Sequence, residues 1–153
     1  MVAGPDPGHA FPAIALCLRF LAAGDTPVLL TGVEWLDTAR TAGLEAVELA
    51  GLDPGEDDDD SDAGAKIHQR AARMAVLNVP VLTDLGCDLV VSDVITACGG
   101  MAAELIGIPW VELSPHPLYL PSKGLPPVGS GLAPGTGVGG RLRDTVMRAF
   151  TAR

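Results

Sequence analysis

Two ionisable side chains stand where a parallel α/β protein holds a reacting group. Gly8 and His9 come directly before an apolar run with helical spacing, and Ser92 and Asp93 follow the apolar residues 89–91. An imidazole can take a proton from a hydroxyl group, and a carboxylate bonded to that imidazole fixes its tautomer and stabilises its charged form. The pair therefore indicates general-base chemistry, with a local capping role for either residue as the alternative.

The elements that must position these two residues alternate between strand and helix. Periodicity, Gly and Pro predict helices and strands at these places: helices over 12–23, 34–42, 65–85, 96–106 and 141–153, and strands over 2–3, 28–30, 45–49, 89–91 and 110–113. The strands are nearly continuous in apolar character, which predicts an α/β fold: a Rossmann-like parallel sheet with helices on both faces. In such a sheet, ligands bind outside the carboxyl ends of the strands, where the loop carrying His9 and the residue Asp93 would meet.

The length of the chain predicts a single domain over residues 1–153. With 153 residues and 48% hydrophobic composition, the chain can bury one sizeable core but not two. Residues 53–62 are rich in Asp and Glu, which predicts a mobile acidic loop. Residues 114–140 are dense in Pro and Gly, which predicts a long irregular loop.

Charge and hydropathy exclude several classes of protein. The net charge is −9 and the basic residues are scattered, so we expect no nucleic-acid partner. The apolar stretches fall short of the roughly 20 residues that cross a bilayer, so we expect no transmembrane segment. A basic leader and cleavage site are also missing, which favours a cytoplasmic location. The three cysteines are expected to be buried free thiols: Cys17, Cys87 and Cys98.

The acidic run Asp57–Asp60 invites a metal-binding interpretation that the sequence does not favour. A calcium loop needs spaced oxygen ligands and a turn glycine, and the run has neither. We therefore expect no metal site. His68 lies on a predicted helix among polar neighbours and is expected to be an exposed structural residue.

The sequence around His9 and Asp93 resembles two signatures of one enzyme family. Residues 8–16, GHAFPAIAL, followed by LAAGDTPV at 21–28, resemble the G-H-x-x-P opening of GT-B glycosyltransferases that act on lipophilic natural products. Residues 88–93, DLVVSD, and 102–111, AAELIGIPWV, are similar to the second signature of that family. The resemblance covers nearly the whole chain and identifies it as the N-terminal, acceptor-side half of a family-1-like enzyme.

The resemblance implies a reaction and a role for each matching residue. His9 would be the base that deprotonates the acceptor hydroxyl, and Asp93 would be its partner. The sugar would move from a nucleotide sugar, the co-substrate, to a hydroxylated apolar acceptor by direct displacement, without a metal or another cofactor. We assign five residues to acceptor binding: Gly8, Phe11, Pro12, His116 and Tyr119. For His116 and Tyr119 the alternative is a proline-rich loop that packs on itself.

The chain also departs from the family pattern. The first strand is only a stub, and Asp25 stands where the family often has another His. The C-terminal domain that binds the donor is missing from a chain of this length, so we expect a truncated protein, inactive alone, that meets a nucleotide sugar only together with such a domain.

Two further interpretations stay open. In the first, the chain is a non-catalytic module that binds a small molecule or a protein. In the second, it is a relative of the peptidoglycan N-acetylglucosaminyltransferase, which has a similar opening. The amphipathic helix predicted over 141–153 would favour association with a partner.

Overall fold

The structure is a computed structural model that describes residues 1–55, 63–116, 124–127 and 130–151. These residues form two compact units, Met1–Pro115 and His116–Arg153, each of which is described by itself. The single domain expected over 1–153 stays a prediction. The acidic loop expected at 53–62 lies outside the described residues from position 56 onward.

Unit 1 is built on a parallel sheet. Its strands are β1 (Val28–Thr31), β2 (Glu45–Glu48), β3 (Val90–Asp93) and β4 (Trp110–Leu113). β1 pairs with β2 and β3 pairs with β4, both in parallel. Val2 bridges Leu30 on one side and Ser92 on the other, so the order across the sheet is β2, β1, Val2, β3, β4.

The first residues of the chain occupy the centre of this sheet. The Val2 N–H donates to the Val91 carbonyl at 2.8 Å, and the Asp93 N–H donates to the Val2 carbonyl at 2.8 Å. On the other side, the Ala3 N–H donates to the Leu30 carbonyl at 3.0 Å. The short strand predicted at 2–3 is therefore an isolated bridge, but its backbone is hydrogen-bonded to both neighbouring strands.

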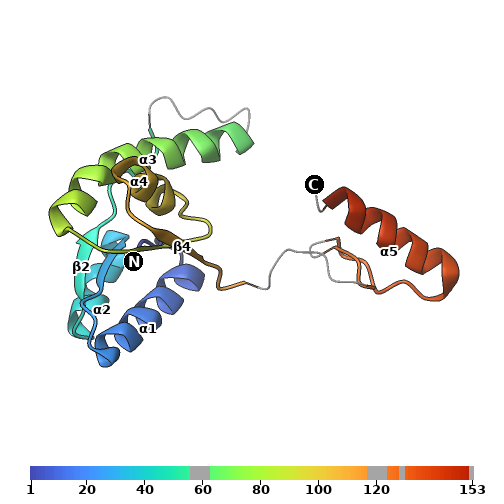
Figure 1. Cartoon of the computed structure of the whole chain (residues 1–153), viewed down its shortest axis with the longest axis horizontal. Helices are drawn as coiled ribbons and strands as arrows, with labels where there is room; N and C mark the ends of the chain where they lie inside the picture. Colours follow the sequence, from blue (N-terminus) through green and yellow to red (C-terminus); the bar gives the residue numbers. More distant parts are fainter. Residues whose placement is uncertain (56–62, 117–123, 128–129, 152–153) are drawn as a thin grey trace. The chain divides into compact units, whose positions relative to one another are not determined.

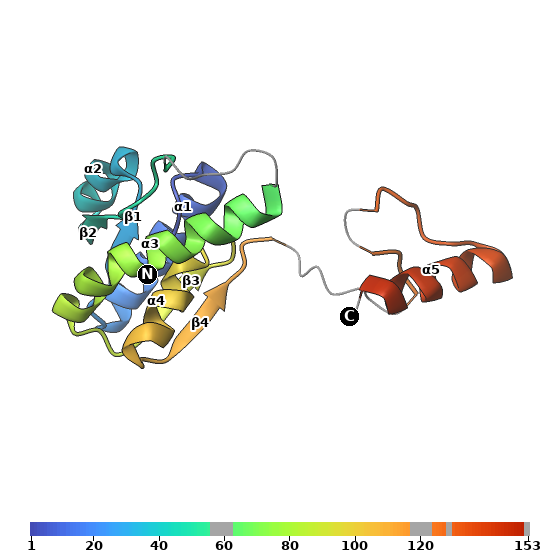
Figure 2. The same cartoon turned by 90° about the horizontal axis from the view of Figure 1, so that it is seen from above.

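Helices cover both faces of the sheet (Figures 1 and 2), as α1 (Pro7–Ala23) and α2 (Val33–Thr41) lie on one face and α3 (Ala63–Leu85) and α4 (Cys98–Ile106) on the other. Successive side chains of a strand point to opposite faces. Val2 and Leu30 accordingly join the core under α3 and α4, whereas Ala3 and Leu29 join the core under α1 and α2.

The start of α1 differs from the sequence prediction. The Pro/Gly segment before His9 reads as a loop that delays the helix to Pro12, but the helix begins at Pro7. The Asp6 side chain caps it by accepting a hydrogen bond from the Gly8 N–H at 2.8 Å. Proline is favoured at the first helical position, because the N–H that it lacks would have no partner there. The loop position predicted for His9 is therefore wrong, and His9 lies in the first turn of α1.

Two other boundaries are corrected. β3 includes Ser92 and Asp93, which the sequence predicts to follow the strand, so Asp93 is the last residue of the strand. In unit 2, α5 (Gly137–Thr151) begins inside the segment 114–140, which the sequence predicts to be irregular throughout. The Gly135 N–H donates to the Asp144 carboxylate at 2.7 Å, which ties the approach to α5 to its second turn. This hydrogen bond and the neighbouring Arg143 lower the pKa of Asp144.

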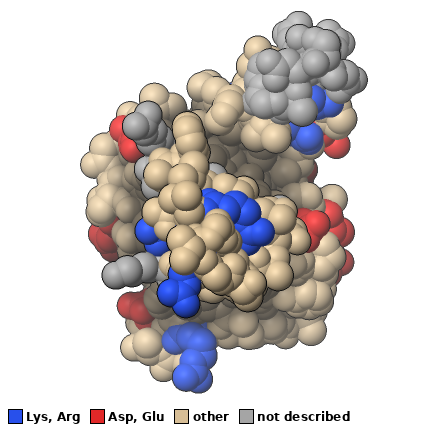
Figure 3. Space-filling view, turned by 90° about the vertical axis from the view of Figure 1, so that its right-hand side faces the viewer, with Lys and Arg blue, Asp and Glu red and all other residues tan. Residues whose placement is uncertain are grey.

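The surface carries apolar as well as charged side chains. On the face drawn in Figure 3, uncharged surface predominates, and both acidic and basic groups are present. Exposed large apolar residues of unit 1 include Ile67, of which 65% is exposed, and Ile95, of which 61% is exposed. No described helix has the combination of length and apolar character that crossing a bilayer requires.

The cysteines differ in expected reactivity. Cys17 and Cys98 are buried and Cys87 is half-buried, and all three are free thiols. Burial raises the pKa of the Cys17 thiol, and it raises the pKa of Cys98 to about 11. Because the thiolate is the nucleophile, we expect iodoacetamide at about pH 8 to modify Cys87 first and the other two only after unfolding. Mass spectrometry of the native and the denatured chain measures this, and rapid labelling of Cys98 in the native chain would contradict the burial described here.

Candidate active site

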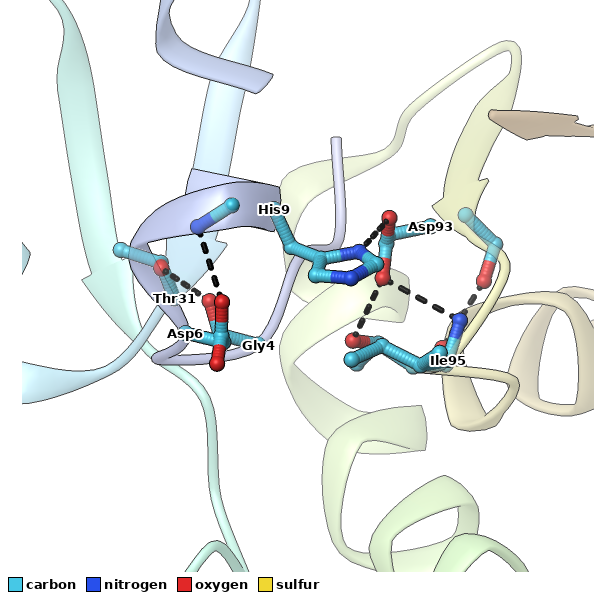
Figure 4. Close-up of polar contacts among 9 residues, drawn as sticks. Gly4, Asp6, His9, Thr31, Asp93 and Ile95 are labelled. Carbon is cyan, nitrogen blue, oxygen red and sulfur yellow. Dashed lines mark hydrogen bonds and ion pairs between the residues drawn. The ribbon is translucent and has the colours of Figure 1, made fainter. Parts of the chain in front are cut away.

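His9 and Asp93 lie in direct contact although 84 positions separate them in the sequence. The Nδ1 atom of His9 is 2.6 Å from the Oδ1 atom of Asp93 (Figure 4). Both residues are buried, with 4% of His9 and 1% of Asp93 exposed. The two side chains therefore form a short hydrogen bond in the protein interior.

The sheet accounts for this contact. Val2 is a direct neighbour of β3, and Asp6, four residues after Val2, caps α1. This short connection places His9 beside the carboxyl end of β3. The His9 N–H donates to the Asp6 carbonyl at 2.9 Å and so belongs to the same cap. Because parallel strands end at the same edge of a sheet, the first turn of α1 and the last residue of β3 meet there.

The second oxygen of the Asp93 carboxylate is also engaged. Its Oδ2 atom accepts from the Ile95 N–H at 3.2 Å and from the Thr96 hydroxyl at 3.2 Å. An ionised carboxylate only accepts hydrogen bonds, so the Nδ1 of His9 is the donor in their contact. In a neutral imidazole with its proton on Nδ1, the lone pair lies on Nε2. An imidazole held by a carboxylate in this way can act as a base.

No group of three or more His, Cys, Asp or Glu residues within the described parts of the chain has the geometry to hold a metal ion. The run Asp57–Asp60 lies outside those parts.

Comparison with known proteins shows which proteins this chain resembles. No protein-family model matches the chain. L-demethylnoviosyl transferase of Streptomyces niveus is 31% identical over 124 residues, an alignment that covers 72% of this chain and 32% of that enzyme. The chain is a relative of the GT-B glycosyltransferases. It spans about a third of the length of this curated enzyme.

Solved structures of glycosyltransferases share the fold of this chain. The glycotransferase of kitacinnamycin superposes with a TM-score of 0.66 at 22% identity, over 80% of this chain and 31% of that one. SsfS6 of Streptomyces sp. SF2575, in complex with thymidine diphosphate, superposes with a TM-score of 0.61 at 21% identity, over 74% of this chain and 37% of that one. The predicted fold class, a Rossmann-like parallel sheet as in the N-terminal half of a GT-B fold, is confirmed.

Three other predicted site residues of this chain lie in α1 with His9: Gly8, Phe11 and Pro12. Gly8 is exposed, and Pro12 is half-buried within α1. Phe11 is 55% exposed, and its ring meets that of Trp35 edge to face with centroids 4.8 Å apart. Trp35, which the sequence analysis does not single out, also donates to the Pro5 carbonyl at 2.6 Å. The acceptor-binding role of these residues stays a prediction.

The structure does not test the placement of His116 or Tyr119 relative to the pair. His116 is the first residue of unit 2, which is described separately from unit 1. Tyr119 lies outside the described residues. Their assignment to acceptor binding also stays a prediction.

A cavity of about 550 Å³ lies on the Asp93 side of the pair. Its walls come from four places in unit 1: the turn at Gly4 and Pro5, the segment after β2, the first half of α3, and the segment from the end of β3 to the start of α4. The lining residues are Gly4, Pro5, Leu52, Ile67, His68, Arg70, Ala71, Met74, Val94, Ile95, Thr96, Ala97 and Cys98. Most of these residues are apolar. The sequence analysis did not assign any of them to a binding site. It predicted only the general location, the carboxyl ends of the strands. His68 is exposed as predicted, but it lines this cavity.

Another cavity, of about 510 Å³, opens at the amino ends of β1 and β3. Its lining includes Asp25 and Asp88, and neither this cavity nor the one of about 550 Å³ is lined by His9 or Asp93 themselves. Because ligands of open α/β sheets bind at the carboxyl ends, the cavity beside Asp93 is the better candidate for a substrate.

Proposed function

We propose that this chain is the acceptor-binding half of a glycosyltransferase that moves a sugar from a nucleotide sugar to a hydroxyl group of a lipophilic small molecule. The observation that carries the proposal is the 2.6 Å contact between His9 and Asp93 at the carboxyl edge of the sheet. A relationship to GT-B glycosyltransferases supports the class of reaction.

In the proposed reaction the acceptor oxygen attacks the anomeric carbon of the donor sugar. A bond forms between that oxygen and the anomeric carbon as the bond from this carbon to the phosphate oxygen breaks, and the nucleoside diphosphate leaves. The Nε2 atom of His9 takes the hydroxyl proton, which makes the oxygen a better nucleophile. The Asp93 carboxylate holds the reactive tautomer and stabilises the imidazolium that forms.

The cavity beside Asp93 supports a lipophilic acceptor. A volume of about 550 Å³ is in the range of pockets that bind drug-sized molecules. Leu52, Ile67 and Ile95 supply apolar walls, and contact with an apolar ligand would remove the exposed parts of the two isoleucines from water. Gly8, Phe11 and Pro12 would bind the acceptor from the side of α1.

We propose that the donor is bound mainly by a second domain. The chain spans 32% of the length of L-demethylnoviosyl transferase, which leaves most of that enzyme without a counterpart here. SsfS6 binds thymidine diphosphate, so a thymidine-diphosphate sugar is the first donor to test. The isolated chain would then be inactive. Three free thiols fit a reducing compartment and support a cytoplasmic location.

The test is to restore transfer by complementation. The whole chain is co-expressed with the part of L-demethylnoviosyl transferase that lies outside the aligned segment, and the purified pair is supplied with nucleotide sugars and hydroxylated apolar acceptors. We expect a glycosylated acceptor from the pair and none from either part alone, measured by mass spectrometry of the product. A folded and associated pair that transfers no sugar to any acceptor of the panel would refute the proposal and favour a non-catalytic binding module.

A further inference from the structure

Thr96 contacts the side of the Asp93 carboxylate that faces away from His9. The Thr96 hydroxyl is 3.2 Å from Oδ2, whereas His9 meets Oδ1. The backbone of the same turn is closed by a hydrogen bond of 2.9 Å from the Thr96 N–H to the Asp93 carbonyl. The threonine is therefore placed by its own backbone to donate to the carboxylate.

The position of Thr96 is fixed from two further directions. Only 6% of the residue is exposed, and its carbonyl accepts a hydrogen bond from the Ser92 hydroxyl at 3.0 Å. Gly4, which follows Val2 and Ala3 in the chain, approaches so closely that a Cβ atom on it would lie 3.0 Å from the Thr96 Oγ1 atom. Because the turn, β3 and Gly4 all surround the hydroxyl, it has little freedom to leave the carboxylate.

These contacts restrict the rotation of the carboxylate. If the Asp93 group turned about its Cβ–Cγ bond, Oδ2 would lose its two donors and Oδ1 would lose His9. Without the Thr96 hydroxyl, Oδ2 would keep one of its two donors, the Ile95 N–H. Hydrogen bonds to a charged carboxylate are among the stronger ones in proteins.

We propose that Thr96 is a positioning residue: its hydroxyl orients the Asp93 carboxylate so that His9 is held with its proton on Nδ1 and its lone pair on Nε2. Its importance for catalysis rests on the function proposed above. The effect of Thr96 on the orientation of His9 does not depend on that function, because this orientation is a property of the chain itself and is measurable without any sugar transfer.

The experiment compares Thr96→Val with Thr96→Ser in the full chain. Valine has nearly the shape of threonine but no hydroxyl, and serine keeps the hydroxyl. Nitrogen-15 NMR of the His9 ring at alkaline pH gives the fraction of each neutral tautomer. We expect the unchanged chain and Thr96→Ser to carry the proton on Nδ1, and the Nε2-protonated fraction to rise several-fold in Thr96→Val.

A folded Thr96→Val chain with the same tautomer fractions as the unchanged chain would overturn the proposal. If the valine variant does not fold, Thr96→Ala, which introduces no added bulk, provides the same comparison. In the complemented pair we expect kcat to fall roughly 10-fold in Thr96→Val, as for loss of an outer hydrogen-bond partner at metal-bound imidazoles. The KM for the acceptor should stay unchanged, and Thr96→Ser should restore kcat.

The two readouts separate the two proposals. A changed tautomer in Thr96→Val with no transfer by the unchanged pair would leave Thr96 as the positioning residue of the pair and remove the glycosyltransferase function. Transfer by the unchanged pair with no change of tautomer or kcat in Thr96→Val would keep the glycosyltransferase function and remove the positioning role of Thr96.

Discussion

Replacing His9 by alanine is expected to lower the kcat for sugar transfer in the complemented pair by about 10²–10⁴-fold, the range that a positioned general base supplies. The KM for the donor should change little, because His9 is proposed to act on the acceptor hydroxyl. Initial rates at saturating donor measure the effect. His9→Gln is a second test, since glutamine is polar but cannot act as a base.

Asp93 provides an internal control for this prediction. Asp93→Asn removes the charge that holds the His9 tautomer while it keeps the size of the side chain, and we expect it to lower kcat as well. If the two residues act as one unit, the double variant should be no slower than His9→Ala alone. A His9→Ala pair that keeps more than about a tenth of the unchanged kcat would contradict the assignment of His9 as the base.

The largest expected effect on stability comes from a glycine that lets α4 approach the sheet. A Cβ atom on Gly99 would lie 2.7 Å from the Val2 Cβ atom and 2.8 Å from the Ser92 hydroxyl oxygen. Neither distance is possible without movement of α4 away from Val2 and β3. Overpacking of this kind costs about 1–3 kcal/mol. We expect Gly99→Ala to lower the free energy of unfolding by this amount, as measured by urea denaturation.

The matched control is the same substitution in another helix. A Cβ atom on Gly139 in α5 meets nothing within 4 Å. Alanine favours the helix over glycine by up to about 1 kcal/mol, so Gly139→Ala should be neutral or stabilising. Equal effects of the two substitutions would mean that helix propensity, and not contact with Val2 and Ser92, governs Gly99.

Much of the α/β order was predictable because each element has a local signal. The predicted strand at 110–113 coincides with β4, and the helix predicted over 96–106 ends at Ile106 as expected, followed by Gly107 at φ 75°. The start of α1 was not predictable from Pro and Gly content, because the same residues that break a helix also begin one. Only the cap formed by Asp6 distinguishes the two cases.

The site was predictable in part. A strand-end rule directs attention to His9 and Asp93, since each is predicted to lie close after the end of a strand, and the structure brings them together. The cavity residues Ile67 and His68 gave no such signal, because they lie on a helix whose place depends on its packing against α4. Thr96 was also missed, since its contact depends on the turn after β3.

The central place of Val2 in the sheet has a consequence for synthesis of the protein. Val2 leaves the ribosome before every strand with which it pairs, and its neighbour Ser92 is translated 90 residues later. At about 5–20 residues per second, the first residues wait several seconds for β3. Until then the nascent chain lacks the partner that completes its core, so a chaperone that binds apolar segments would meet the segment around Val2 before β3 is made. Slow codons placed upstream of residue 90 would lengthen that wait, and slow codons after β4 would not.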